Sequence, residues 1–146
     1  MVQHSKLLHK SQSYGVKGGL LNWIDSFLSN ITHCTKVGDA ISMPTSIRSG
    51  VIQGSCIGPL LFLIYIDDIT ECIQQPVSVK LYADDVKLYT SVRSVSDYST
   101  LQSCLQRISE WSVTWQLPMS VSKCSSLNIA TQHNKLPPLS HLQLGS

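Results

Sequence analysis

The chain has 146 residues, of which 42% are hydrophobic and only 14% are charged, and its net charge is +2. A balance so close to neutral excludes electrostatic nucleic-acid binders of the histone or basic-tail kind. A mean hydropathy of +0.07 excludes a disordered chain, because disorder pairs low hydrophobicity with high net charge. The length fits one ordinary domain, and the shortage of charge predicts a surface that packs against another part of a protein.

Cysteine spacing and targeting signals add few constraints. The five cysteines are odd in number and widely spaced, which indicates neither a zinc site nor a disulfide framework. Residues 1–10 lack the apolar core of a signal peptide. The longest apolar run, residues 57–66, is about half the length that a membrane span needs. We therefore expect a soluble intracellular protein.

Helical and extended patterns alternate in the first half of the chain. Apolar residues recur at helical spacing through residues 18–31, which predicts a helix with one apolar face. Two short β-prone runs, residues 32–37 and 41–47, flank Gly38 and Asp39, and this pattern predicts a β-hairpin.

A glycine-rich loop at residues 49–58 separates that hairpin from a strongly apolar segment. Pro59 opens the apolar segment, and proline suits the first turn of a helix. We therefore expect a buried helix that begins at Pro59 and ends near Asp67 and Asp68.

A second hairpin is predicted in the middle of the chain. Residues 77–83 and 86–90 alternate between apolar and polar side chains, and Asp84 and Asp85 lie between the two runs. Alternation on both sides of turn-tolerant residues is typical of a hairpin, here with both aspartates in its turn.

The remaining pattern is helical and then weak. Apolar residues keep helical spacing from Asp97 to Trp115, with Ser96 or Asp97 as the expected N-cap. Residues 127–130 are expected to form a short strand. Helices that alternate with hairpins predict an α+β fold, in which helices pack on an antiparallel sheet and leave one of its faces to be covered.

The sharpest chemical feature is the pair Asp84–Asp85 at the predicted hairpin tip. Adjacent carboxylates repel one another unless a cation binds, and hard oxygen ligands suit Mg²⁺. Two such ions can activate an attacking hydroxyl and hold a leaving pyrophosphate. An ordinary solvated turn has the same dipeptide, so these two residues alone leave both interpretations open.

The glycine-rich loop is the second feature. Gly50, Gly54 and Gly58 recur every four residues, with Gln53 and Ser55 between them. Glycine lets a ligand approach the backbone closely, and an amide side chain can hydrogen-bond a base or a sugar. The spacing matches neither the dinucleotide fingerprint nor a P-loop, and glycines that merely turn the chain remain an alternative.

Together the two features resemble a known family. The stretch SGVIQGSCIGPLLFLIYIDDI, followed by VKLYADDVKLY, resembles the reverse transcriptases of non-LTR (LINE-type) retrotransposons. The likeness extends to residues 4–8, 14–16 and 20–24 before these motifs, and to residues 101–102, 111, 115–117 and 123–124 after them. Residues 141–145 resemble the start of the family's primer grip, so the likeness covers essentially the whole chain.

The resemblance implies a partial palm domain, residues 1–146, from an RNA-directed DNA polymerase that needs Mg²⁺. The implied metal ligands and catalytic carboxylates are Asp84 and Asp85. Lys123 falls where the family has a lysine near the nucleotide phosphates that can protonate pyrophosphate, although a solvated surface lysine is an equal alternative. The implied partners of the intact enzyme are an RNA template, a DNA primer and a deoxynucleoside triphosphate.

Six further residues are implied to contact nucleotide or template. The family places a tyrosine and an alanine of this motif near the primer end, and it places the glycine loop beside the incoming nucleotide and the template. The corresponding residues are Tyr82 and Ala83 in the hairpin, and Gly50, Gln53, Gly54 and Ser55 in the loop.

The chain also departs from the family pattern. Ile52 stands where proline is usual, and the first aspartate motif would fall immediately before Met1. Without that carboxylate, the fingers and the thumb, we expect no polymerase activity from this chain alone, since two-metal phosphoryl transfer depends on positioning and charge neutralisation. The alternatives are a domesticated, non-catalytic palm module that binds RNA or a protein, and a truncated gene model.

Overall fold

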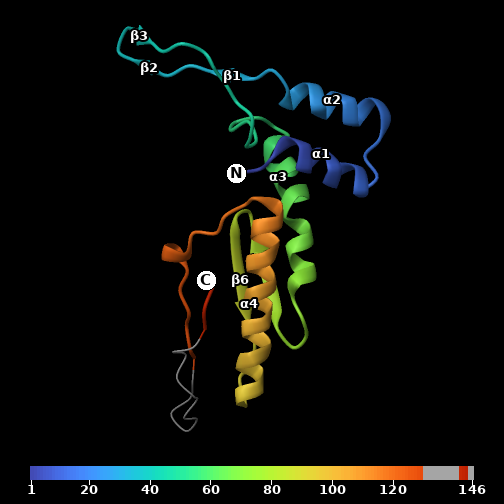
Figure 1. Ribbon diagram of the computed structural model, residues 1–146, viewed down its shortest axis with the longest axis vertical. Coiled ribbons are helices and arrows are strands. Elements are labelled where there is room, and N and C mark those ends of the chain that lie inside the picture. Colours follow the sequence, from blue (N-terminus) through green and yellow to red (C-terminus); the bar gives the residue numbers. More distant parts are fainter. Residues whose placement is uncertain (130–141, 145–146) are drawn as a thin grey trace. The chain divides into compact units, whose positions relative to one another are not determined.

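The computed structural model describes residues 1–129 and 142–144 (Figure 1). Their secondary structure consists of helices and three small antiparallel sheets, which confirms the predicted α+β class. In chain order the elements are α1 (His4–Ser13), α2 (Gly18–Leu28), β1 (Thr32–His33), β2 (Lys36–Val37), β3 (Ala40–Ile41), β4 (Thr45–Ser46), α3 (Gly58–Ile66), the 3₁₀-helix η1 (Asp67–Cys72), β5 (Ser78–Tyr82), β6 (Asp85–Tyr89), α4 (Val95–Trp115) and the 3₁₀-helix η2 (Val121–Lys123). The chain divides after Asp67 into two compact units, which are described separately below.

Helix α1 is the centre of the first unit, and the sequence pattern did not predict it. It contacts both α2 and α3. Its buried residues are Leu7, Lys10 and Ser11, so two of the three are polar and the helix lacks an apolar stripe. Lys10 donates a hydrogen bond from Nζ to the carbonyl oxygen of Tyr65, and its ammonium lies 5.0 Å from the centre of the Tyr65 ring. A polar contact thus joins α1 to the end of α3. Hydrophobic periodicity does not detect such a contact, so the sequence pattern gave no signal for α1.

The predicted helix at residues 18–31 and the hairpin after it are confirmed. Helix α2 ends three residues earlier than expected, and it buries Ile24 and Leu28. Strand β2 pairs with β3 around Gly38 and Asp39, and β1 pairs with β4 farther from this turn. Every residue of these four strands is exposed, so the hairpin extends from the unit without a core of its own.

The apolar segment after the glycine loop forms α3, so the predicted helix is confirmed, but the prediction that it is buried holds for one side only, because Leu60 is 58% and Leu63 48% exposed. The helix begins at Gly58, with Pro59 in its first turn, and it ends at Ile66. Tyr65 and Leu61 are almost completely buried. The chain then tightens into η1 instead of stopping at the two aspartates.

In the second unit, η1 and the residues after it run antiparallel to α4. Three hydrogen bonds join them in order. Trp111 Nε1 donates to Asp68 Oδ1 over 2.8 Å, Arg107 donates to the carbonyl of Glu71 over 2.9 Å, and the backbone N–H of Gln74 donates to Cys104 Sγ over 3.4 Å. A 3₁₀-helix has three residues per turn, so positions 68 and 71 lie on one face, as do positions 104, 107 and 111 of an α-helix. The three-residue period of η1 and the 3.6-residue period of α4 therefore place the contacting residues of both elements along one line.

The start of α4 differs from the prediction. Ser94 is the N-cap, not Ser96 or Asp97. The Asp97 carboxylate reaches back to accept hydrogen bonds from the backbone N–H groups of Arg93 and Ser94, each over 2.8 Å. A serine followed three residues later by an acidic residue forms a capping box, which explains why the helix begins earlier than expected.

The end of the chain gives a second difference. Residues 127–129 have no strand, and residue 130 of the predicted strand lies outside the described residues. The backbone of Gln143 exchanges two hydrogen bonds with the side chain of Gln102, which attaches this short segment to α4. Among the described residues, none of the helices has the length and apolar character that crossing a membrane requires.

Candidate functional site

The hairpin of β5 and β6 carries the two aspartates at its closed end. Its register pairs Tyr82 with Asp85, so the two-residue turn consists of Ala83 and Asp84. Ala83 adopts a positive φ of 50°, a conformation that L-residues adopt at some cost. The prediction that both aspartates occupy the turn is therefore wrong for Asp85, which is the first residue of β6. The turn lies one residue earlier because Tyr82 and Asp85 extend the ladder.

The two faces of this hairpin differ in exposure. Val79, Leu81 and Leu88 are half-buried, whereas the intervening residues point to solvent. The exposed face carries three cross-strand pairs: Ser78 with Tyr89, Lys80 with Lys87, and Tyr82 with Asp85. The predicted alternation is complete in β5 but not in β6, where Val86 lies on the apolar face and is 40% exposed.

The carboxylates of Asp84 and Asp85 are exposed and make no hydrogen bond or ion pair with the residues that the structure describes. Two unneutralised neighbouring carboxylates offer hard oxygen ligands to a divalent cation. Within residues 1–129 and 142–144, no group of three or more histidine, cysteine or acidic side chains is placed to hold a metal. Two adjacent carboxylates fit a divalent cation that takes its remaining ligands from outside the described residues.

The glycine loop has the backbone that its sequence suggests. Gly50 has a φ of 93° and Gly54 a φ of 83°, both in the region that disfavours other residues. Gln53 and Gly54 are exposed, so the amide of Gln53 is available to a ligand. A Cβ on Gly58 would lie 2.7 Å from Ser55 Oγ and 2.8 Å from the carbonyl oxygen of Ile52, which explains the third glycine of the series.

Ser55 has a structural task in this loop. Its hydroxyl donates to the carbonyl of Ile52 over 2.7 Å and accepts the N–H of Gly58 over 3.0 Å. Both bonds lie at the start of α3, where the first N–H groups have no partner within the helix. Ser55 therefore holds the loop against the helix, and Gln53 and Gly54 are left as the accessible tip.

The chain near the N-terminus anchors the other end of the loop. The N–H of Gly50 donates to the carbonyl of Val2 over 2.6 Å, and Nε2 of His4 lies 2.8 Å from the carbonyl oxygen of Gly50. Gln3 and Ser49 form an antiparallel bridge between these bonds. Sequence reasoning did not find this anchor, since residues 46 positions apart share no local pattern.

Lys123 lies at the end of η2 with its side chain exposed, and no partner for it occurs in the described part of the chain. The predicted site residues therefore form separate groups. Gly50, Gln53, Gly54 and Ser55 belong to the first unit, whereas Tyr82, Ala83, Asp84, Asp85 and Lys123 belong to the second. The predicted primer-grip segment is described at residues 142–144 only, and positions 141 and 145 lie outside the described residues.

A cavity of about 390 Å³ lies at the open end of the same hairpin. Pro76, Thr90, Ser91, Arg93 and Asp97 line it. These residues lie before β5 or after β6, at the opposite end from Ala83 and Asp84. The cavity is therefore not part of the carboxylate site.

Comparison with known proteins gives one consistent family. A family model described as reverse transcriptase (RNA-dependent DNA polymerase) matches residues 1–137. The chain is 29% identical over 146 residues to the RNA-directed DNA polymerase from mobile element jockey of Drosophila melanogaster, with 95% of this chain and 16% of that polymerase covered. It is 27% identical over 120 residues to the probable RNA-directed DNA polymerase from transposon X-element of the same species, with 80% and 13% covered.

A third relative comes from another insect. The chain is 24% identical over 150 residues to the retrovirus-related Pol polyprotein from type-1 retrotransposable element R2 of Popillia japonica, with 95% of this chain and 24% of that polyprotein covered. The chain thus spans between one eighth and one quarter of the length of these relatives.

Proposed function

The chain belongs to the reverse transcriptase family, and from this premise we propose that it is the palm segment that carries the hairpin carboxylates of an RNA-directed DNA polymerase. The family implies dependence on a divalent metal, and an RNA template and a primer for the intact enzyme. The observation that supports the proposal most directly is the exposed Asp84 in the tight turn between β5 and β6, with Asp85 beside it.

Each candidate residue has a role in this proposal. Asp84 and Asp85 would hold Mg²⁺ together with the nucleotide phosphates, and the bound ion would lower the pKa of an attacking hydroxyl and offset charge on pyrophosphate. Tyr82 and Ala83 shape the turn beside the primer end. The ammonium group of Lys123 places a positive charge beside the leaving pyrophosphate and can donate a proton to it.

The glycine loop has the complementary role of receiving the nucleotide and the template. Gly50 and Gly54 keep side chains away from the backbone, so that a ligand can approach it closely. Gln53 offers both an acceptor and a donor to a base or a sugar edge. Ser55, the fourth loop residue of the proposed nucleotide and template site, also fixes the loop to the start of α3 through its two hydrogen bonds.

We further propose that this chain does not polymerise by itself. Two exposed carboxylates from one turn are the acidic groups that this site offers, and the described residues gather no third acidic ligand beside them. Phosphoryl transfer depends on positioning and on charge neutralisation, so an incomplete ligand set costs orders of magnitude in rate. A primer-extension assay on the purified chain tests this part of the proposal. Extension by the parent chain that the Asp84→Ala variant no longer shows would overturn it.

Metal binding at the hairpin is testable without activity. Mn²⁺ can replace Mg²⁺ and broadens the NMR signals of nearby amides, so substoichiometric Mn²⁺ should broaden residues 82–87 of the full chain. Asp84→Asn should remove most of this broadening. Asp39→Asn is the matched control, because Asp39 is an exposed turn aspartate of the other hairpin and has no acidic neighbour. Broadening that is spread evenly over the acidic residues, or that persists in Asp84→Asn, would favour the alternative of a non-catalytic module.

A further inference from the structure

The side chain of His4, the first residue of α1, contacts the backbone of the glycine loop. Its Nε2 atom lies 2.8 Å from the carbonyl oxygen of Gly50. A carbonyl oxygen can only accept a hydrogen bond, so Nε2 must carry a proton and donate it. The neutral Nε2–H tautomer and the charged ring both meet this requirement, whereas the neutral Nδ1–H tautomer does not.

Both polar backbone groups of Gly50 are engaged within the chain. Its carbonyl accepts from His4, and its N–H donates to the carbonyl of Val2 over 2.6 Å. With a φ of 93° and no side chain, this glycine would otherwise act as a free hinge where the loop begins. The two bonds therefore fix the direction in which the loop leaves the N-terminal segment.

The other end of the loop is fixed by Ser55, whose hydroxyl bonds the carbonyl of Ile52 and the N–H of Gly58. Between the two fixed ends, the N–H groups of residues 51–54 make no hydrogen bond within the part of the chain that the structure describes. The order of this segment therefore depends on how its ends are held. A loop that is ordered before its ligand arrives binds more tightly than one that must be ordered on binding.

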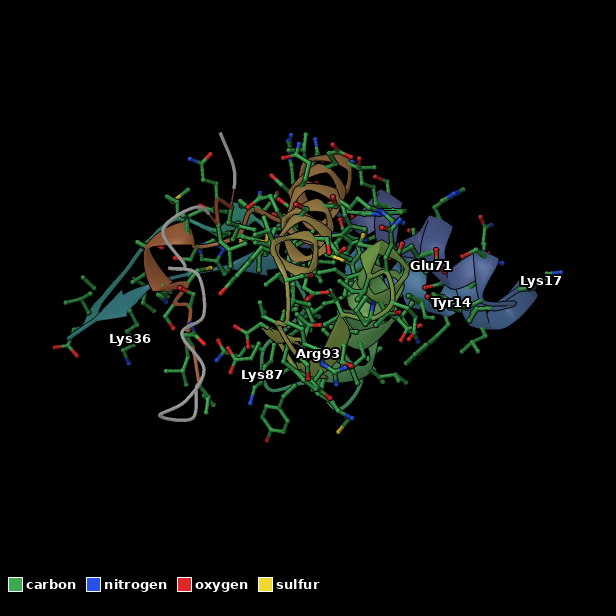
Figure 2. All side chains as sticks on the ribbon, turned by 90° about the horizontal axis from the view of Figure 1, so that it is seen from below. Tyr14, Lys17, Lys36, Glu71, Lys87 and Arg93 are labelled. Atoms are coloured by element: carbon green, nitrogen blue, oxygen red, sulfur yellow. The ribbon has the colours of Figure 1, made fainter. Side chains whose placement is uncertain are left out.

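Helix α1 itself does not depend on the His4 contact. Lys10 bonds the carbonyl of Tyr65 from the middle of the helix. Tyr14, which directly follows α1 and is labelled in Figure 2, donates from its hydroxyl to Asp67 Oδ2 over 3.0 Å. Loss of the His4 donor should therefore release the loop and leave α1 in its place.

We propose that His4 is a positioning residue of the glycine loop: its Nε2–H group holds the Gly50 carbonyl, and thereby orders residues 51–54 for a nucleotide. His4 does not touch the ligand in this role. The inference deepens the proposed function and rests on it in one respect, namely that the loop receives a nucleotide.

The first test measures backbone ¹⁵N order parameters of residues 51–54 in the full chain. A rigid backbone gives about 0.85 and a flexible one less than about 0.6. The parent chain should lie near the rigid value, and His4→Leu should move residues 51–54 toward the flexible value because the ring donor is lost. His4→Gln should restore the order, since its side-chain N–H lies the same number of bonds from Cβ as the Nε2–H of the ring.

The tautomer of His4 is a signature that packing alone would not produce. When the rings are neutral, long-range ¹H–¹⁵N NMR spectra should show His4 as the Nε2–H tautomer alone. His9 is the reference, because it is exposed on the same helix and has no hydrogen-bond partner among the described residues. It should show both tautomers. His9→Leu is the matched control for His4→Leu and should leave the order of residues 51–54 unchanged.

The second test titrates the full chain with dTTP and Mg²⁺ and follows the NMR signals of the Gln53 side-chain amide and the Gly54 backbone. His4→Leu should weaken binding by about threefold to tenfold, the change that loss of one hydrogen bond gives. The reason is that a smaller share of the molecules then has the loop in its binding geometry. His4→Gln should recover most of the affinity, and circular dichroism checks that each variant is folded.

Several results would overturn the inference. They are unchanged order of residues 51–54 in His4→Leu, no recovery in His4→Gln, an equal effect of His9→Leu, a mixture of tautomers at His4, and equal dTTP affinity in the parent chain and in His4→Leu. The failure of the proposed function gives a different result. If dTTP shifts neither Gln53 nor Gly54 in the parent chain, the nucleotide role of the loop is rejected, and the order parameters still decide whether His4 positions it.

Discussion

The indole Nε1 of Trp111 donates a hydrogen bond to Oδ1 of Asp68 over 2.8 Å, and this bond fixes α4 against the start of η1. Trp111 is 8% exposed, so its ring also belongs to the core of the second unit. Since the β5–β6 hairpin lies between these two elements in the chain, the bond fixes both ends of the segment that presents the two aspartates.

Replacement of Trp111 by Phe tests this relationship. The ring stays aromatic, but the Asp68 carboxylate loses a donor and the core loses volume, so the free energy of unfolding should fall by about 1–3 kcal/mol. Urea unfolding followed by circular dichroism measures the change. Asp68→Asn keeps an oxygen acceptor at the same place and should cost clearly less. Unchanged stability in Trp111→Phe would contradict the assigned hydrogen bond.

Gly58→Ala tests the packing between the glycine loop and α3. A Cβ at this position meets Ser55 Oγ at 2.7 Å and a backbone oxygen of Ile52 at 2.8 Å, and the backbone oxygen cannot rotate away. We expect a loss of about 1–3 kcal/mol in stability, because the loop must shift to admit the methyl group. Hydrogen exchange of the amides of residues 50–58 should also become faster.

Gly19→Ala is the matched control for that substitution. Gly19 lies inside α2, and nothing lies within 4 Å of its added Cβ. Alanine is the better helix former by about 1 kcal/mol, so this variant should be as stable as the parent or more stable. An equal loss in the two variants would mean that the contact with Ser55 and Ile52 does not explain Gly58.

Lys87→Gln should stabilise the chain even though it removes a charge. The change relieves the repulsion from Lys80 across the hairpin, which is worth about 0.2–1 kcal/mol. The gain should shrink at high salt, since both ammonium groups are exposed and therefore screened. Thermal melts at low and high salt measure it. Lys36→Gln, which faces Ile41 instead of a cation, should show no such salt-dependent gain.

The elements that local patterns specify were predictable, and those that depend on distant partners were not. The alternation in β5 and β6 and the Gly38–Asp39 pair of the first hairpin predicted both hairpins, because each signal lies within a few residues. Helix α1 was missed because Lys10 and Ser11 are buried through polar contacts, which hydrophobic periodicity does not register.

The candidate site shows the same division. The motif containing Asp84 identified the carboxylates, but a two-residue turn fits the sequence at either 83–84 or 84–85, and the pairing of Tyr82 with Asp85 decides between them. That register also opposes Lys80 to Lys87, so the exposed cationic pair follows from the turn and not from composition. The anchor between His4 and Gly50 required a contact across 46 positions.

The capping box of α4 predicts a dependence of stability on acid. The backbone N–H groups of Arg93 and Ser94 and the Ser94 hydroxyl donate to the Asp97 carboxylate, and these bonds lower the pKa of Asp97 below its ordinary value of 3.8. A carboxyl group whose pKa is lower in the folded chain stabilises the fold above the unfolded pKa. This stabilisation is lost as the pH falls through the lower, folded value.

Asp97→Asn should therefore lower stability at neutral pH and flatten the decline of stability below pH 3.8, and urea unfolding between pH 6 and pH 2.5 measures both effects. The Asp39→Asn variant should keep the decline of the parent chain, because Asp39 is exposed in the Gly38–Asp39 turn and caps no helix. A parallel decline in the parent chain and in Asp97→Asn would show that the capping box does not contribute to acid sensitivity. Since α4 begins at this box and ends beyond Trp111, its loss should also speed hydrogen exchange in the first turns of α4 more than in its last.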